Sequence, residues 1–180
     1  PFTNYIEWLD FTLHIIASDA DADNWYIRPH PSAELYENDA EILDFYLLKH
    51  GFASSGSCKG PTLLQILQQQ MPVYTCTGTV ILEAPIFGYK AFFCGRRFPE
   101  TFGSYAHSKP MWEAYLKMDV QSAQNFSVSI GDGLRNESMQ ALYMMYGCRP
   151  LAGICPDRAI MPQDDGLAYV KAGLTGLKNV

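Results

Sequence analysis

The sequence has few charged residues and no long apolar run. Charged side chains make up 18% of the 180 residues, and the formal net charge is -6. The basic field that holds nucleic acid or an anionic membrane surface is therefore lacking. No apolar stretch reaches the length of a membrane span, and the first residues lack the charged and apolar blocks of a signal peptide. We expect no nucleic-acid partner and no transmembrane segment.

The cysteines do not form a recognisable framework. There are five, an odd number, and no two have Cys-x-x-Cys spacing, so neither a zinc site nor a set of disulfides is predicted. Cys76 and Cys94 lie in apolar, strand-like runs, where a thiol acts as a small hydrophobic side chain. A reducing cytoplasm is the simpler location. The Asp19, Asp21, Asp23 run lacks the glycine and glutamate of an EF-hand loop, so no metal site is predicted.

Apolar periodicity and the placement of proline and glycine predict alternating helices and strands. Helices are expected at residues 5–18, 38–50, 62–70, 83–87, 110–118 and 134–146, and strands at residues 25–27, 73–76 and 90–94. Residues 95–109 are expected to form a long loop. This alternation predicts an α/β fold, a Rossmann-like parallel sheet with helices on both faces, over residues 1–150. Residues 151–180 are an unassigned C-terminal extension.

Two polar segments are predicted at the edge of this sheet. Ligands of open parallel sheets bind beyond the carboxyl ends of the strands. Arg28, His30 and Ser32 follow the strand at 25–27, and the prolines between them restrict the backbone and direct the side chains outward. The residues 77–79, Thr-Gly-Thr, follow the strand at 73–76 and precede a helix.

The second segment has the chemistry of a phosphate site. Free N–H groups at a helix N-terminus favour an anion, and Gly78 allows close approach while the hydroxyls of Thr77 and Thr79 donate to it. Glu83, one turn further on, can accept hydrogen bonds from ribose hydroxyls. The plainer alternatives stay open: the threonines as helix caps, Glu83 as a solvated helix residue and His30 as a loop histidine.

Both segments resemble motifs of the bacterial capsule-polysaccharide biosynthesis family, which is similar to Kdo transferases and includes GT-B glycosyltransferases that use CMP-Kdo. The likeness is carried by residues 24–36, which include Arg28-Pro29-His30-Pro31-Ser32, and by residues 77–90, from Thr77 to Lys90. It covers roughly residues 6–146. Pro85 departs from the family, whose members usually carry a small or aliphatic residue there.

The resemblance implies an enzyme that transfers a sugar from a CMP-activated donor to a glycan or glycolipid acceptor in surface-polysaccharide or lipopolysaccharide synthesis. It implies that His30 is catalytic and contacts the nucleotide phosphate, with Arg28, Ser32, Thr77, Gly78, Thr79 and Glu83 lining the nucleotide site. No cofactor beyond the nucleotide sugar is implied. A GT-B enzyme has a second, N-terminal domain, so the resemblance implies that this chain is only the donor-binding half. Such an enzyme works in the cytoplasm or peripherally at the inner membrane.

Several alternatives remain at this stage. The chain can instead be part of a GT-B enzyme that uses CDP-glycerol or a UDP-sugar, or it can be a non-catalytic interaction domain with the same fold. Arg96 and Arg97, in the expected loop, suit a sugar carboxylate, although a solvated loop is as good an interpretation. Cys58, before a helix, has the setting of a reactive thiol but no identified base.

Overall fold

The computed structural model describes residues 1–19, 22–29, 38–54, 60–128 and 130–146. The chain divides into two compact units. We call residues 1–62 and 106–119 the helical unit, and residues 63–105 and 120–180 the sheet unit. The expected single domain of residues 1–150 thus spans parts of both units, and residues 151–180 lie outside the described residues.

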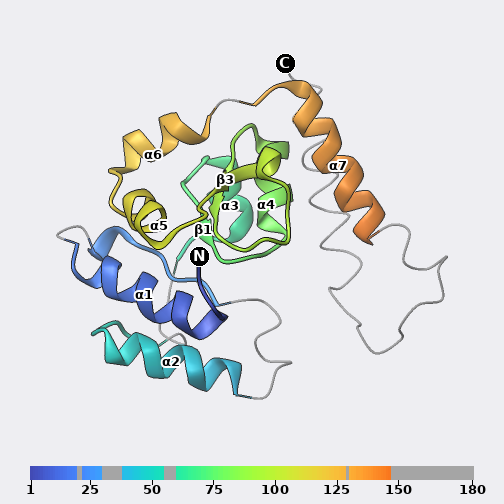
Figure 1. The fold of residues 1–180 in the computed structure, drawn as a ribbon. Helices are drawn as coiled ribbons and strands as arrows, with labels where there is room; N and C mark the ends of the chain where they lie inside the picture. Colours follow the sequence, from blue (N-terminus) through green and yellow to red (C-terminus); the bar gives the residue numbers. More distant parts are fainter. Residues whose placement is uncertain (20–21, 30–37, 55–59, 129, 147–180) are drawn as a thin grey trace. The chain divides into compact units, whose positions relative to one another are not determined.

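The helical unit is built around helix α1 (Tyr5–Ala17), which contacts α2 (Asp39–Lys49) and α5 (Lys109–Leu116) (Figure 1). A short 3-10 turn, η1 (Ala22–Asn24), follows α1. Asn4 begins α1: its side-chain oxygen accepts a hydrogen bond from the Glu7 amide at 2.8 Å. This satisfies one of the amides that the first helical turn leaves without a partner.

Apolar stripes at helical spacing form the core of this unit. Leu9 and Leu13 of α1 pack against Leu43 and Leu47 of α2. The partly buried side chains around them are Trp8, Ile27, Tyr46 and Phe52. From α5, Trp112 is fully buried, and its indole N–H donates to the Thr12 hydroxyl at 2.9 Å. The helices predicted for these segments are confirmed.

The strand predicted at residues 25–27 is wrong. Residues 25–29 have no regular secondary structure, and Tyr26 is 55% exposed. Ile27 alone joins the core between α1 and α2. The described part of the helical unit contains no strand that could pair with this segment, so the segment stays irregular. Arg28 therefore does not follow a strand end.

The sheet unit holds three short parallel strands, β1 (Tyr74–Thr75), β2 (Ala91–Phe93) and β3 (Gly103–Tyr105), in the order β1-β2-β3. Tyr74 pairs with Phe92, and Phe92 with Ser104. The parallel sheet is confirmed, but β3 lies inside the expected loop. Its Gly-Ser-Tyr sequence has no apolar run, and Gly103 is required because a Cβ there would lie 2.5 Å from the Ala91 carbonyl oxygen.

Six helical segments accompany the sheet. They are α3 (Leu63–Gln68), α4 (Val80–Glu83), η4 (Ala84–Phe87), η5 (Glu100–Phe102), α6 (Val120–Ser127) and α7 (Asp132–Tyr146). The helix expected at 83–87 is almost entirely the 3-10 turn η4, which continues from the preceding α-helical turn α4. Pro85 lies in that second turn and has no N–H to bond. The α6 segment was not foreseen.

Helices pack on the sheet through two adjacent residues of β2, Ala91 and Phe92. The ring of Phe126 in α6 stacks at 5.9 Å on that of Phe92, while Leu67 of α3 and Ala84 of η4 pack with Ala91. Because adjacent strand residues point to opposite faces, these contacts lie on opposite faces of β2. The fold is mixed α/β, with a small open parallel sheet and helices. Among the described helices, none combines the length and apolar character that crossing a membrane requires.

Candidate functional site

The loop after β1 carries three of the predicted phosphate-binding residues. Thr77 is exposed, whereas Gly78 and Thr79 are partly exposed. The Thr75 hydroxyl donates to the Thr77 carbonyl oxygen at 3.3 Å and holds the turn. Residues 77–79 therefore lead from the carboxyl end of β1 directly into α4, as the sequence indicates.

The loop after β2 contacts the loop after β1. The Gly95 amide donates to the Cys76 carbonyl oxygen at 2.7 Å. A Cβ at Gly95 would lie 2.6 Å from that oxygen and 3.2 Å from the Thr77 Cβ. Only a glycine permits this approach, and it is followed directly by Arg96 and Arg97, both exposed. The structure therefore brings two arginines to the same sheet edge as the Thr-Gly-Thr turn.

The N-terminus of helix α4 is a weaker phosphate-binding site than the sequence predicts. It contains four residues, so few peptide dipoles align behind its N-terminus. Thr79 occupies the N-cap position but makes no capping hydrogen bond. Its hydroxyl bonds the Glu83 carboxylate instead, and its one proton is then not available to a phosphate. The positive charge at this edge comes from the arginines of the neighbouring loop.

Glu83 is buried rather than solvated. It is 8% exposed, and burial raises the pKa of its carboxyl group while the hydrogen bond from Thr79 opposes that shift. One carboxylate oxygen, Oε2, has no hydrogen-bond partner among the described residues. Whether this carboxylate receives a ribose stays a prediction, but the solvated-helix alternative is excluded for this conformation.

Other buried polar atoms in the sheet unit share this property. Within the described part of the chain, the Tyr89 hydroxyl, Arg135 Nε and Ser138 Oγ also have no hydrogen-bond partner. Arg135 and Ser138 lie on α7, which packs against α4 and η4. The Glu83 charge and burial both raise the pKa of Tyr89, burial more strongly. Buried polar groups without partners are costly and rare. The sheet unit therefore has hydrogen-bond donors and acceptors that the described fold does not use.

Of the first predicted segment, Arg28, His30 and Ser32, only Arg28 belongs to the described residues. Arg28 is exposed, and its guanidinium donates to the Pro61 carbonyl oxygen at 3.4 Å. His30 and Ser32 lie outside the described residues, as does Cys58. The convergence of His30 with Thr77–Thr79 on one phosphate therefore stays a prediction, as does the nucleotide contact of Arg28.

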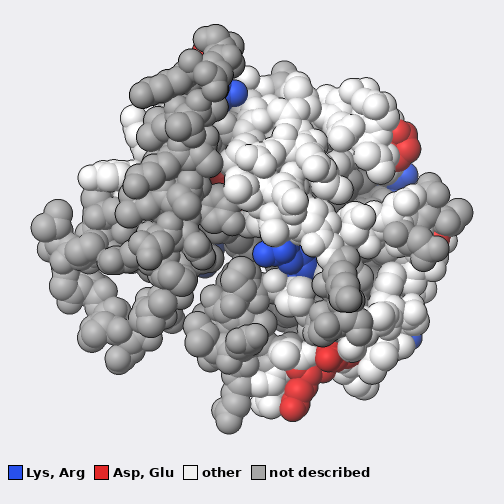
Figure 2. Space-filling view, turned by 180° about the vertical axis from the view of Figure 1, so that it is seen from behind, with Lys and Arg blue, Asp and Glu red and all other residues white. Residues whose placement is uncertain are grey.

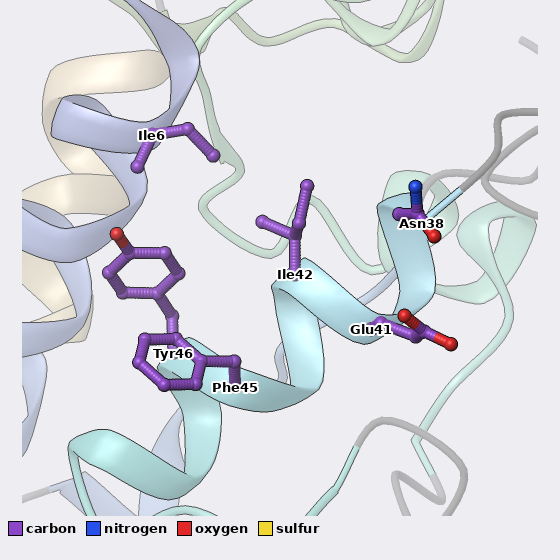
Figure 3. Close-up of a pocket in the computed structure, with 6 residues that line it drawn as sticks. All are labelled: Ile6, Asn38, Glu41, Ile42, Phe45 and Tyr46. Carbon is purple, nitrogen blue, oxygen red and sulfur yellow. The ribbon is translucent and has the colours of Figure 1, made fainter.

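A shallow pocket of about 310 Å³ lies in the helical unit (Figure 3). Its lining is mostly apolar, with Ile6 from α1 and Ile42, Phe45 and Tyr46 from α2, and its polar groups are Asn38, Glu41 and the Tyr46 hydroxyl. None of the described residues that line it is basic. The pocket thus lacks the donors that a phosphorylated ligand requires.

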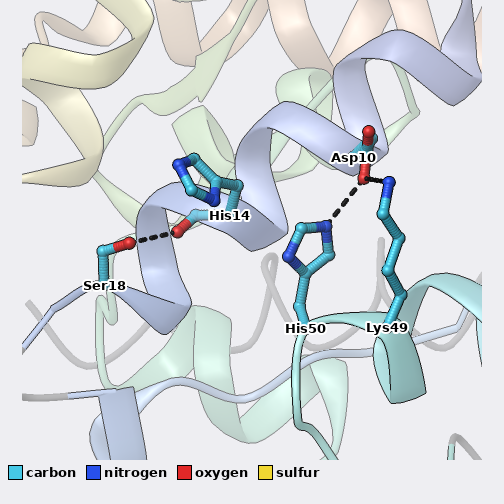
Figure 4. A network of polar contacts seen from close by, with 5 residues as sticks. All are labelled: Asp10, His14, Ser18, Lys49 and His50. Carbon is cyan, nitrogen blue, oxygen red and sulfur yellow. Dashed lines mark hydrogen bonds and ion pairs between the residues drawn. The ribbon is translucent and has the colours of Figure 1, made fainter.

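A network of polar contacts also joins α1 and α2 (Figure 4). Asp10 Oδ1 lies 2.7 Å from both Lys49 Nζ and His50 Nε2, and these hydrogen bonds lower the pKa of Asp10. The Ser18 hydroxyl donates to the His14 carbonyl oxygen, not to an imidazole. Although serine, histidine and aspartate lie near one another, the serine is not aligned as a nucleophile. This network links α1 to the C-terminal end of α2.

The distribution of charged and metal-binding side chains limits which kinds of ligand site the described residues can form. The face drawn in Figure 2 shows mostly uncharged surface, with basic side chains in small groups. Over the described residues, no group of three or more His, Cys, Asp or Glu side chains is arranged to hold a metal ion. An anion would therefore be bound by local donors such as Arg96, Arg97 and Thr77, and not by a broad positive field.

Comparison of the chain with protein-family models, curated proteins and solved structures finds no match. The resemblance to capsule-polysaccharide enzymes therefore rests on the two motifs alone.

Two features of the site were not foreseen from the sequence. Gly95 was placed at the start of a loop, without its role in joining that loop to Cys76. The glycine directly after an apolar strand was the available signal, since glycine there often marks a close backbone approach. The burial of Glu83 had no local signal, because its neighbours Leu82 and Ala84 are both apolar and do not indicate which side of the turn is buried.

Proposed function

We propose that this chain is the donor-binding part of a two-domain GT-B glycosyltransferase, which binds a nucleotide-activated sugar at the carboxyl edge of the parallel sheet. The proposal includes a larger Rossmann-like sheet, a CMP-linked donor, a glycan or glycolipid acceptor and a cytoplasmic location, all taken from the motif resemblance. Sugar transfer itself would need the second domain.

The observation that carries the proposal is the contact between Gly95 and Cys76. Because Gly95 lies against Cys76 and Thr77, the exposed residues Arg96 and Arg97 follow directly at the edge that carries the Thr77–Thr79 turn. Arginine binds phosphate oxygens in a bidentate manner, and the exposed Thr77 has a hydroxyl group that can donate to them. This donor set suits the phosphate of a nucleotide sugar.

The same groups would also assist the chemistry. In glycosyl transfer from a nucleotide sugar, the bond from the anomeric carbon to the phosphate oxygen breaks, and negative charge develops on the leaving phosphate. Arg96, Arg97 and the Gly78 amide would stabilise that charge, an effect worth several kcal/mol in preorganised sites. The acceptor's base would come from the second domain.

The test is calorimetric titration of the full chain with CMP, CDP and UDP, using cytidine as the phosphate-free comparison. We expect a nucleotide to bind and cytidine to bind more weakly. Replacing both arginines (R96A/R97A) should weaken binding about tenfold or more, because each charge-assisted hydrogen bond contributes about 1.5–3 kcal/mol.

The matched control is K117A, which removes an exposed cation of the helical unit and should leave affinity unchanged. Preference for CDP or UDP over CMP would favour the related glycerol-phosphate or UDP-sugar chemistries. If a folded sample binds none of the nucleotides, or if R96A/R97A binds them as tightly as the wild type, the proposed site is wrong.

A further inference from the structure

Cys76 and Cys94 occupy equivalent positions at the ends of two neighbouring strands. Each follows its strand by one residue: β1 ends at Thr75 and β2 at Phe93, and those two residues are register partners. The next pair in that register is Cys76 with Cys94. Register partners on adjacent parallel strands point to the same face and are about 4.8 Å apart, within the Cα separation that a disulfide bridges.

Contacts on both sides hold the pair in place. Two residues earlier on the same face, the rings of Tyr74 and Phe92 stack at 4.7 Å and 8°. One residue later, the Gly95 amide bonds the Cys76 carbonyl oxygen at 2.7 Å. Both cysteines are free. The register of β1 and β2 therefore places two reduced thiols side by side on one face of the sheet.

The two thiols are not equivalent. Cys76 is partly exposed, whereas Cys94 is 3% exposed. The hydrogen bond from the Cys94 thiol lowers the pKa of Cys76, and that same bond, together with burial, raises the pKa of Cys94. The thiolate is the reactive form of cysteine, so Cys76 is the nucleophile of the pair and Cys94 the buried partner beside it.

We propose that Cys76 and Cys94 form a reversible dithiol–disulfide site that is oxidised by peroxides and closed across the ends of β1 and β2. The Cys76 thiolate attacks one peroxide oxygen; the O–O bond breaks, the other oxygen takes up a proton and leaves as water, and Cys76 becomes a sulfenic acid. The Cys94 sulfur then attacks the Cys76 sulfur, and the sulfenic oxygen leaves as water with the Cys94 proton. Two electrons pass from the two thiols to the peroxide.

This inference does not depend on the proposed function, because it uses only the register of β1 and β2 and the chemistry of the thiols. It bears on the same edge, however. The disulfide would link the residue before Thr77 to the residue before Gly95, and so would join the two loops covalently. A dithiol reductant would reverse the step by thiol–disulfide exchange.

The experiment uses the full chain with Cys58, Cys148 and Cys155 replaced by serine, so that only the pair remains. After treatment with hydrogen peroxide, we expect the loss of both titratable thiols and a mass lower by two hydrogens. Trypsin should then release peptide 60–90 linked to peptide 91–96, and dithiothreitol should separate them. Circular dichroism before and after treatment checks that the protein stays folded.

The single variants distinguish the roles. With C94S, peroxide should leave a Cys76 sulfenic acid that dimedone labels, while the intact pair should give no such label. With C76S, the buried Cys94 should react more slowly than Cys76 does in C94S. The wild-type chain, digested in the same way, repeats the cross-link measurement without any substitution.

The proposal is overturned if the folded protein keeps both thiols titratable after treatment. It is also overturned if Cys76 in the intact pair accumulates as sulfinic acid without the cross-linked peptide, since the neighbouring thiol would then be out of reach.

Discussion

The two units treat their polar side chains differently. Around α1, the polar groups are paired: Asp10 bonds Lys49 and His50, and the Trp112 indole bonds Thr12. Among the described residues of this unit, Trp8 Nε1 is the one buried side-chain polar atom without a partner. In the sheet unit, Glu83 Oε2, the Tyr89 hydroxyl, Arg135 Nε and Ser138 Oγ are all buried and unpartnered within the described structure.

This difference indicates a division of roles. A buried polar group that is fully hydrogen-bonded stabilises the fold, whereas an unsatisfied one lowers stability and is found where a protein has a further use for it. In the helical unit, the hydrogen-bonded polar groups therefore contribute to the stability of the fold. The sheet unit has the unpartnered polar atoms, the exposed arginines and the thiol pair, and both proposals made above rest on it.

The largest effect is expected from truncating the core of the helical unit. Trp112 is fully buried, and its ring lies 6.3 Å from that of Trp8. The W112A variant should lose about 3–5 kcal/mol of unfolding free energy, because it creates a large cavity and leaves the Thr12 hydroxyl unpaired. Denaturant titration followed by circular dichroism measures the loss.

The control in the same unit is F45A, since Phe45 is 62% exposed. It should cost less than about 1 kcal/mol. A similar loss for both variants would mean that the packing around Trp112 does not hold the helical unit together.

A smaller effect is expected from adding one methyl group at the sheet edge. In G95A, the new Cβ would lie 2.6 Å from a backbone oxygen, so the loops after β1 and β2 must separate. We expect a loss of about 1–3 kcal/mol in stability, together with weaker nucleotide binding in the calorimetric assay.

The matched control is G133A on α7, where a Cβ meets nothing within 4 Å. Alanine is the better helix former, so this variant should keep or raise stability by up to about 1 kcal/mol. If G95A behaves like G133A, the contact between the two loops is not as close as described.

The buried carboxyl group should make stability depend on pH. Burial raises the pKa of Glu83 in the folded state above its ordinary value of 4.5. The folded protein therefore binds the Glu83 proton more tightly than the unfolded chain does. The stabilisation that this proton provides is fully present below pH 4.5 and is lost as the pH rises through the folded-state pKa. Each unit of pKa difference corresponds to about 1.4 kcal/mol.

E83Q cannot ionise and should remove this dependence. Relative to the wild type, the variant should gain stability as the pH rises from acidic to neutral, measured by denaturant midpoints across that range. E137Q, at an exposed position of α7, should show no such trend. A parallel pH profile for E83Q and the wild type would contradict the burial of Glu83.

The smallest effect is expected at the ion pairs between α1 and α2. Hydrogen bonds from Lys49 and His50 lower the pKa of Asp10, so its contribution is present above the ordinary value of 3.8 and is lost as the pH falls through the lower folded-state pKa. Asp10 is 38% exposed, and water therefore screens the interaction. D10N should cost no more than about 0.5 kcal/mol at neutral pH in a denaturant titration. If D10N lost as much unfolding free energy as W112A, the ion pairs of Asp10 would be a main source of stability in the helical unit.

Local patterns were enough to predict most helices and the parallel β1–β2 pair. The stripe through Leu9 and Leu13 predicts α1, and the apolar runs before Cys76 and Cys94 predict β1 and β2. The failures have a common cause. Residues 25–27 have the composition of a strand but no strand beside them, whereas β3 has none of that composition and is held by pairing with β2. Strand formation depends on a partner, which local sequence does not specify.

The amino-acid sequence by itself determined most of the helices, the strands β1 and β2 and the position of the Thr-Gly-Thr turn, because these follow from periodicity and backbone preference within a few residues. Only the tertiary structure decided that Gly95 brings Arg96 and Arg97 to that turn, that Cys94 lies beside Cys76, and that Glu83 is buried. Those facts depend on the register between strands and on helices distant in the chain, and the physical reason is that hydrogen-bonded pairing and burial are made between segments, not within them.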